Sequence, residues 1–230
     1  MALGGLLHYL YETQKTDLSH INDLDYYEQG RFMELDLTAR RNLELTETLR
    51  DREKRGSLLW VLDKTRTPMG GRLLRSWLER PLLSVTAIAK RNAAVAALVE
   101  STMAREELIA ALTGLGDMER LIGRIVYGTA GGRDMVSLRS AIERLPALRA
   151  QLAAFSGGRL AELAGELDDL TEIGAHIGAA ICDEPPFSVR EGGFIRDGYH
   201  EEVDRLRHIM NGGKGVLAEI EAKEKEQIGR

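Results

Sequence analysis

The sequence predicts an all-α protein built from many helices, with one small β-hairpin near the N-terminus. Aromatic residues make up only 5% of the chain, while Leu, Ala, Glu and Arg are abundant, and this composition favours helix over sheet. Capping residues mark helix starts, and glycines separate apolar repeats of helical period. A chain of 230 residues is also long enough to bury a core of its own.

The N-terminal part combines a short helix with the hairpin. Residues 3–13 are predicted as an amphipathic helix, because their leucines fall on one side. Residues 31–37 alternate polar and apolar side chains at period two, and residues 21–27 supply the partner arm across a Glu-Gln-Gly turn. These residues are predicted to form the only sheet of any size.

Helices dominate from residue 67 onward. Thr67 is an N-cap followed by proline at the first helical position, so a helix is predicted over Pro68–Glu79, ended by Pro81. Ser84 caps a second helix that runs to about Glu100. Glycines and Pro185-Pro186 delimit the helices that follow. They are predicted at 103–113, 117–127, 133–154, 159–169 and 172–182.

The last predicted helix, residues 199–227, carries apolar residues at alternating spacings of four and three, as in a coiled coil. As one helix it would be about 44 Å long. Glycines at 212, 213 and 215 interrupt it, and each costs about 1 kcal/mol relative to alanine in a helix interior. The pattern leaves open a kinked helix or a helix–turn–helix break. The positions of this apolar repeat, called here the seam, are Tyr199, Val203, Leu206, Met210, Gly213, Leu217 and Ile220.

Charge and cysteine content exclude several functional classes. The net charge is −5, so the chain as a whole does not attract nucleic acid electrostatically. Residues 37–92 are locally basic, however, and could contact phosphates. The single cysteine, Cys182, excludes an internal disulfide framework and a Cys-based zinc site. No apolar run approaches the roughly 20 residues of a membrane span, and the N-terminus lacks a signal peptide. We therefore expect a cytoplasmic protein without membrane contact.

No catalytic, cofactor-binding or metal-binding site is predicted. The 5 histidines are scattered along the chain, without a ligand set at helical spacing. Gly212-Gly213-Lys214-Gly215 offers glycines and a lysine, but it lacks the spacing and the Ser/Thr of the phosphate-binding loop G-x-x-x-x-G-K-[ST]. The chain is therefore not expected to be an enzyme, and the lack of a convergent polar cluster disfavours an all-helical enzyme.

Several separated blocks together resemble the core domain of the MutS family of DNA mismatch-repair proteins. RRNLEL, GSLL and LDKTRTPMGGRLLRSWLERPL lie within residues 39–82, and GDMERLIGRI and REGGFIRDGYHEEVDRLR follow at 116–125 and 190–207. The opening, LLHYLYETQKTDLSHI, resembles the helix that leads from the connector domain into the core. The hallmark positions are expected to hold packing and turn geometry, not chemistry. They are Thr67, Pro68, Gly70, Arg72, Leu73, Trp77, Leu78, Gly193 and Gly198.

The resemblance implies a connector-to-core helix at 1–20, a helical core domain at 21–198 and the start of a long lever helix at 199–230, with the clamp domain expected after it. It also implies a structural and allosteric role, in which the core couples the DNA clamp to a distant ATPase. The full-length parent would be a homodimer that binds mismatched duplex DNA, uses ATP and Mg, and works with mismatch-repair partner proteins. This chain is expected to hold no cofactor and to bind DNA weakly or not at all. It departs from the family pattern at Ile228-Gly229, where Thr-Gly is usual.

Two other functions remain open at this point. The recombination-suppressing branch of the same family shares the core and the ATPase but lacks mismatch reading. A free-standing helical adaptor or scaffold would instead use the seam over residues 199–220 to bind a partner helix.

Overall fold

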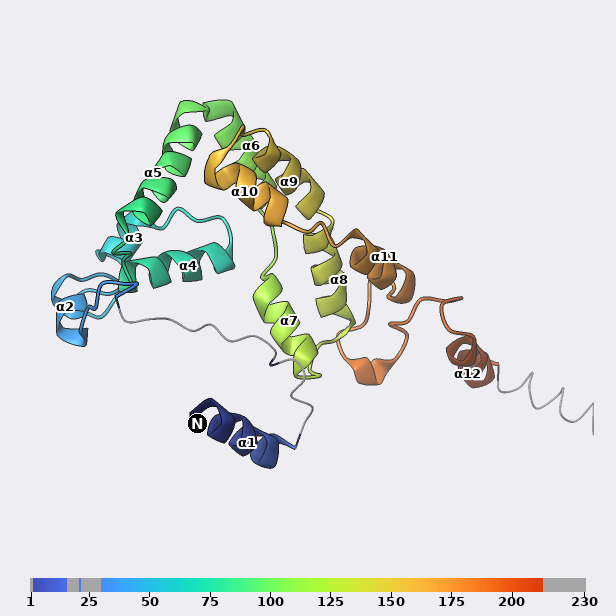
Figure 1. Ribbon diagram of the computed structural model, residues 1–230. Coiled ribbons are helices and arrows are strands. Elements are labelled where there is room, and N and C mark those ends of the chain that lie inside the picture. The colour runs from blue at the N-terminus through green and yellow to red at the C-terminus, as the bar shows by residue number, and fades with distance from the viewer. Residues whose placement is uncertain (1, 16–20, 22–29, 213–230) are drawn as a thin grey trace, which may run out of the picture.

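The computed structural model of the chain describes residues 2–15, 21 and 30–212, and helices dominate these residues (Figure 1). The prediction of an all-α protein is confirmed for them. The β-structure of the described part consists of two isolated bridges, Phe32–Leu82 and Ile181–Ile195. The elements are α1 (Ala2–Gln14), α2 (Leu37–Asn42), α3 (Leu58–Leu62), α4 (Pro68–Glu79), α5 (Val85–Glu100), α6 (Thr102–Leu112), α7 (Met118–Val126), α8 (Gly132–Ile142), α9 (Leu145–Ala153), α10 (Gly158–Glu166), α11 (Thr171–Ala180), the 3₁₀ helix η1 (Val189–Glu191) and α12 (Glu201–Asn211).

Two clusters of buried side chains hold these helices together. The α9–α10 cluster, against which α5 and α6 also pack, consists of Leu148, Leu152, Leu160 and Ala164. The α8–α11 cluster, with α7 packed at its edge, consists of Leu138, Ile142, Ile177 and Ile181. Because α8 and α9 follow one another in the chain, the two clusters are joined end to end (Figure 1). The helix α1 lies apart from this body, and α12 lies at its far end.

Capping side chains set the starts of α4 and α5. Thr67 Oγ1 accepts a hydrogen bond from the backbone N–H of Gly70 at 3.0 Å, and Pro68 occupies the first turn of α4. Ser84 caps α5 in the same way, by accepting from the N–H of Ala87 at 3.3 Å. Each cap satisfies a backbone donor that has no partner inside its own helix. The predicted bounds of α4 are confirmed.

Removing the Thr67 cap is expected to lower the free energy of unfolding by about 1 kcal/mol. Thr67→Ala deletes the acceptor for the Gly70 N–H and leaves Pro68 in place. Ser101→Ala is the matched control, because Ser101 precedes α6 but its side chain makes no capping hydrogen bond. Urea unfolding of the two variants measures the difference, and equal midpoints would contradict a stabilising cap at Thr67.

The prediction of a hairpin arm at 31–37 is wrong. In that stretch only Phe32 forms a β-bridge, and its partner is Leu82, which follows α4. Asp36 starts α2, because its carboxylate accepts a hydrogen bond at 2.6 Å from a backbone N–H in the first turn. A strand cannot continue where this cap begins a helix. Residues 22–27 of the other predicted arm lie outside the described residues.

The helix predicted over 133–154 is in fact two helices, α8 and α9. Pro146 lies in the first turn of α9 and has no N–H to donate to the carbonyl four residues before it, so one continuous helix would lose a hydrogen bond there. Three further elements, α2, α3 and η1, have no counterpart among the predicted helices. They span 6, 5 and 3 residues, which is too short for a periodic pattern.

Candidate functional site

One cluster of charged side chains in the described residues forms a joint between two helices. No group of three or more His, Cys, Asp or Glu side chains in this part is placed to hold a metal ion. None of the described helices is both long enough and apolar enough to cross a membrane. The joint, called here the Arg72 joint, consists of Arg72, Asp117 and Glu119.

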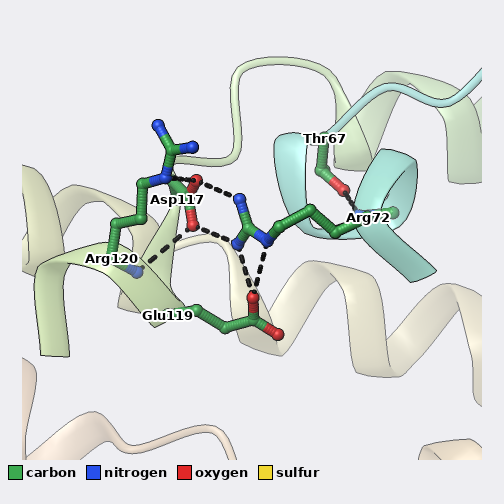
Figure 2. Close-up of polar contacts among 6 residues, drawn as sticks. Thr67, Arg72, Asp117, Glu119 and Arg120 are labelled. Carbon is green, nitrogen blue, oxygen red and sulfur yellow. Dashed lines mark hydrogen bonds and ion pairs between the residues drawn. The ribbon is translucent and has the colours of Figure 1, made fainter. Parts of the chain in front are cut away.

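Arg72 connects the middle of α4 to the start of α7 (Figure 2). Its Nη1 and Nη2 donate to the two carboxylate oxygens of Asp117, each at 2.7 Å, in a bidentate pair. Its Nε donates to Glu119 at 3.0 Å, and Nη2 also contacts that carboxylate. A planar guanidinium that is hydrogen-bonded to two carboxylates in this way restrains both the distance and the relative rotation of the two helices.

Asp117 is also the N-cap of α7, since it accepts a hydrogen bond from the backbone N–H of Arg120 at 3.3 Å. Its hydrogen bonds with the Arg72 guanidinium are the main reason that the pKa of Asp117 falls from 3.8 to about 2. The same contacts raise the pKa of Arg72. The Asp117 side chain is only 15% exposed, so solvent screens this pair less than a fully exposed one. The joint therefore stays charged at neutral pH.

A second shielded carboxylate, Asp63, holds the loop that leads into α4. Lys54 Nζ lies 2.5 Å from one oxygen of Asp63, and the Thr65 hydroxyl donates to the other at 2.6 Å. These two partners, Lys54 first, lower the pKa of Asp63 from 3.8 to about 2. The helix α4 is thus held by ion pairs both before its start and at its middle.

We expect the chain to lose stability as the pH falls from about 4 to about 2. Both Asp63 and Asp117 have a folded-state pKa of about 2, below the ordinary 3.8. The unfolded chain therefore takes up protons first as the pH drops. The stabilisation from these carboxylates is complete above about pH 4 and lost below about pH 2.

Thermal melts followed by circular dichroism across this pH range test the expectation. Asp117→Asn should weaken the dependence of Tm on pH, because one of the two carboxylates whose pKa is lowered to about 2 is gone. Arg75→Met breaks only the exposed pair with Glu79 on α4, so it should retain the full dependence. An unchanged acid dependence in Asp117→Asn would contradict the assignment of the effect to the Arg72 joint.

The apolar hallmark positions on α4 leave a largely uncovered surface. Leu73 and Trp77 are 53% and 41% exposed, and Leu78 is half-buried. Within the described part of the chain α4 contributes no buried residue. The guanidinium of Arg91, from α5, lies 3.6 Å from the centre of the Trp77 ring. The packing role expected for these side chains therefore stays a prediction, because it concerns contacts with residues outside the described part of the chain.

The hallmark glycines lie where another residue would be strained or crowded. Gly193 and Gly198 have φ angles of +74° and +81°, in the left-handed region that favours glycine, and both shape the loop that leads to α12. Gly70 lies in the first turn of α4, where a Cβ would be 3.0 Å from Thr67 Oγ1. A side chain at Gly70 would thus crowd the N-cap itself.

The helix α12 is tied to the loop that precedes it. Arg207 donates to the carbonyl of Ile195 at 3.0 Å, and Asp204 accepts from the N–H of Gly198 at 2.9 Å. The helix ends before Gly212. The predicted continuation over 213–227 lies outside the described residues, so the length of the lever helix stays a prediction.

The seam is anchored at its start and becomes more exposed along α12. The hydroxyl of Tyr199 lies 3.2 Å from Nε2 of His176, on α11. Val203 is half-buried, while Leu206 is 49% and Met210 is 84% exposed. The seam positions outside the described residues are Gly213, Leu217 and Ile220.

Asp117 and Glu119 are functional candidates that the sequence pattern did not single out. An Asp just before an apolar helix is an N-cap signal, and both residues lie in the GDMERLIGRI block. Their partner Arg72, however, is 45 residues from Asp117, and no local pattern joins the two. Only the fold shows that the two blocks meet.

The family MutS domain III matches residues 38–229 of the chain. The chain therefore belongs to the MutS domain III family, and the resemblance seen in the separated blocks is confirmed. It is similar over 99–100% of its length to proteins named DNA mismatch repair protein MutS: 48% identical over 229 residues in Desulforamulus reducens, 47% over 228 in Symbiobacterium thermophilum and 46% over 228 in Lachnoclostridium phytofermentans. The matches cover only 24–26% of these relatives, so the chain spans about a quarter of their length.

Proposed function

We propose that this chain is the structural and allosteric core of a DNA mismatch-recognition protein, in which it couples the clamp that grips DNA to the ATPase. Membership of the MutS domain III family supports the proposal, as do relatives named DNA mismatch repair protein MutS. The parent would supply the ATPase, with ATP and Mg, and would act in the cytoplasm as a homodimer on mismatched duplex DNA, with repair partner proteins. This chain would itself turn over no substrate and would bind DNA weakly or not at all.

The Arg72 joint is the observation that carries the proposal. Coupling requires stiff elements that keep their relative orientation, and a bidentate guanidinium–carboxylate pair restrains rotation as well as distance. Arg72 belongs to the hallmark block of α4, and Asp117 belongs to the block at the start of α7. The joint thus connects two of the blocks on which the family resemblance rests.

From α7 a series of contacts continues to α12. Arg124 of α7 pairs with Asp134 of α8 at 2.7 Å, and α8 packs on α11 through the α8–α11 cluster. Beyond α11, Ile181 bridges to Ile195, whose carbonyl accepts from Arg207 of α12. A displacement of the lever helix would therefore reach α4 through packed elements. The energetic coupling along this series of contacts can be measured directly.

A double-mutant cycle in the parent protein makes this measurement. Arg72→Met and Asp117→Asn each break the Arg72 joint, and the readout is the rate at which ATP releases bound DNA. Allosteric coupling of the usual size corresponds to about 5- to 150-fold. We therefore expect each single variant to change the release rate by at least about fivefold. The double variant should change it no further than Arg72→Met alone, because Arg72→Met already removes the contact with Asp117 together with the contact with Glu119.

Arg75→Met is the matched control on the same helix, because it breaks only the exposed pair with Glu79. It should leave ATP-driven release unchanged. Additive effects of the two joint variants, or unchanged release in both, would contradict coupling through the joint. This chain alone is proposed to turn over no substrate and to bind DNA weakly or not at all. ATP hydrolysis by the chain alone would contradict this, as would tight, mismatch-selective DNA binding in an anisotropy titration.

The exposure of the seam favours one second candidate, a helical adaptor that binds a partner helix. Leu206 and Met210 are 49% and 84% exposed on α12, which an adaptor would bury against its partner. Size-exclusion chromatography with light scattering over a range of concentrations separates the two functions. Self-association that Met210→Glu abolishes would favour the adaptor, whereas a monomer at all concentrations would favour the coupling core.

A further inference from the structure

A carboxylate in the loop after α11 joins two arginines that come from different parts of the fold. The Oδ1 atom of Asp183 accepts a hydrogen bond from Nη1 of Arg139, on α8, at 3.0 Å. The same oxygen accepts from Nη2 of Arg196, in the segment before α12, also at 3.0 Å. Hydrogen bonds from Arg139 first and then Arg196 lower the pKa of Asp183, so the carboxylate stays charged at neutral pH. Asp183 therefore links α8 directly to the segment that leads to α12.

Arg139 is a fixed partner for Asp183, because the helical body that the two buried clusters hold together restrains it on several sides. Its side chain is 19% exposed, and its Nε lies 3.3 Å from the carboxylate of Glu143, four residues further along the chain. The Arg139 stem crosses α11 at Gly178, where a Cβ would lie 3.4 Å from its Cδ. The helices α8 and α11 also pack on one another through the α8–α11 cluster. The guanidinium of Arg139 thus belongs to the rigid part of the fold.

Arg196, the other partner, is attached to α12. It lies between the two residues that Arg207 of α12 contacts, because Arg207 donates to the carbonyl of Ile195 at 3.0 Å and pairs with the carboxylate of Asp197. Arg196 also donates through Nη2 to the carbonyl of Ile181 at 3.1 Å. A change in the position of the segment 195–197 would therefore change the direction of α12.

The apolar and backbone contacts of this segment constrain its rotation less than Asp183 does. Phe194 and Ile195 pack against the α8–α11 cluster, but hydrophobic contact is non-directional. Ile181 and Ile195 form a single β-bridge, and an isolated pair of extended segments is only marginally stable in water. A charge-assisted hydrogen bond is directional and about twice as strong as a neutral one. Asp183 makes two of them, one to α8 and one to the segment before α12.

We infer that Asp183 is a positioning residue that fixes the direction in which α12 leaves the helical body. It holds Arg196 beside Arg139, and the contacts of Arg207 pass this restraint on to α12. The direction of α12 can be measured without any assumption about function. The consequence for DNA release rests on the proposed coupling function, in which α12 begins the lever helix.

Distances between two spin labels in the parent protein test the inference. The labels are attached to the ketone-bearing residue p-acetylphenylalanine, placed at Ala147 on α9 and at His208 on α12, which are both exposed. Double electron–electron resonance then measures the distribution of distances between them. Asp183→Asn should broaden this distribution, because Asn keeps the size of the side chain but loses the charge that holds both arginines. Asp183→Glu restores a carboxylate and should return the distribution toward that of the unsubstituted protein.

Glu162→Gln is the matched control, because Glu162 is also a carboxylate between two cations. It pairs with Lys90 of α5 at 2.7 Å and with Arg159 of α10 at 3.2 Å, away from α12 (Figure 1). Glu162→Gln should leave the distances unchanged. The inference is overturned if Asp183→Asn leaves the distribution unchanged, if Glu162→Gln broadens it equally, or if Asp183→Glu fails to restore it.

The rate of ATP-driven DNA release separates this inference from the proposed function. A substitution along a coupled series of contacts typically changes the coupling enough to alter the release rate by about 2- to 30-fold. We expect a change of this size in Asp183→Asn and a return toward the original rate in Asp183→Glu. A broadened distribution with an unchanged release rate would support the positioning role of Asp183 and would contradict the coupling function instead.

Discussion

Gly132→Val is expected to destabilise the chain by about 3 kcal/mol and to lower Tm by roughly 6–12 °C. Gly132 is the first residue of α8 and is buried. A Cβ at this position would lie 2.7 Å from the Cβ of Pro185 and 3.2 Å from the Cβ of Phe194. One neighbour belongs to a proline ring, and the other is attached directly to the backbone. Neither can yield by a side-chain rotation, so the chain itself must move.

The site of this close approach makes the effect relevant to the loop that leads to α12. The carbonyl of Phe194 accepts a hydrogen bond from the N–H of Cys182 at 3.0 Å, and this contact secures the loop that leads to α12. Displacing Phe194 should therefore loosen the loop before α12 as well as the start of α8. Hydrogen exchange of residues 181–196 in Gly132→Val should increase more than exchange in the α9–α10 cluster.

Gly123→Ala is the matched control, because Gly123 lies inside α7 and a Cβ there would meet nothing within 4 Å. Alanine in place of glycine in a helix interior should stabilise the chain by about 0.5–1 kcal/mol. The two variants should thus move the unfolding midpoint in opposite directions. If the Gly132→Val chain had the same Tm as the Gly123→Ala chain, α8 and the loop at 185–194 would not pack this closely.

Helix starts could be predicted where the signal is local and nothing competes with it. Thr67 and Ser84 illustrate this, because a cap acts on a backbone N–H only three residues away. Asp36 offers the same signal, but the alternation over 31–37 favoured a strand. The extended conformation there serves a single bridge at Phe32. The break between α8 and α9 has a local signal in Pro146, which lies in the first turn of α9, but the helix predicted over 133–154 ran through it.

The candidate site could be predicted only in part, for a physical reason. A periodic pattern shows which face of a helix is apolar, as it does for Leu73 and Trp77, but not what covers that face. The capping role of Asp117 is local, whereas its bidentate pair with Arg72 spans 45 residues and depends on how α4 and α7 are placed. Long-range ion pairs of this kind are a consequence of the fold and have no signature in a single sequence.

Ile142→Ala is expected to cost about 3 kcal/mol of unfolding free energy, because it removes buried methyl groups and leaves a cavity. Ile142 is 2% exposed and lies in the α8–α11 cluster. Its Cγ2 would be 3.0 Å from a Cβ at Gly174, so the side chain packs directly on the backbone of α11. Ile173→Ala is the matched control on α11, since Ile173 is 50% exposed. It should cost less than about 1 kcal/mol.

The contact between Ile142 and Gly174 also makes a sharper prediction, because the two substitutions should not add. Gly174→Ala alone crowds Ile142, and that crowding opposes the gain in helix propensity. In the Ile142→Ala background the crowding is gone, the new methyl enters the cavity, and the propensity gain remains. Gly174→Ala should then stabilise the chain by about 1 kcal/mol. Urea unfolding of the two single variants and the double variant measures this coupling, and strict additivity would show that α8 and α11 do not meet at these residues.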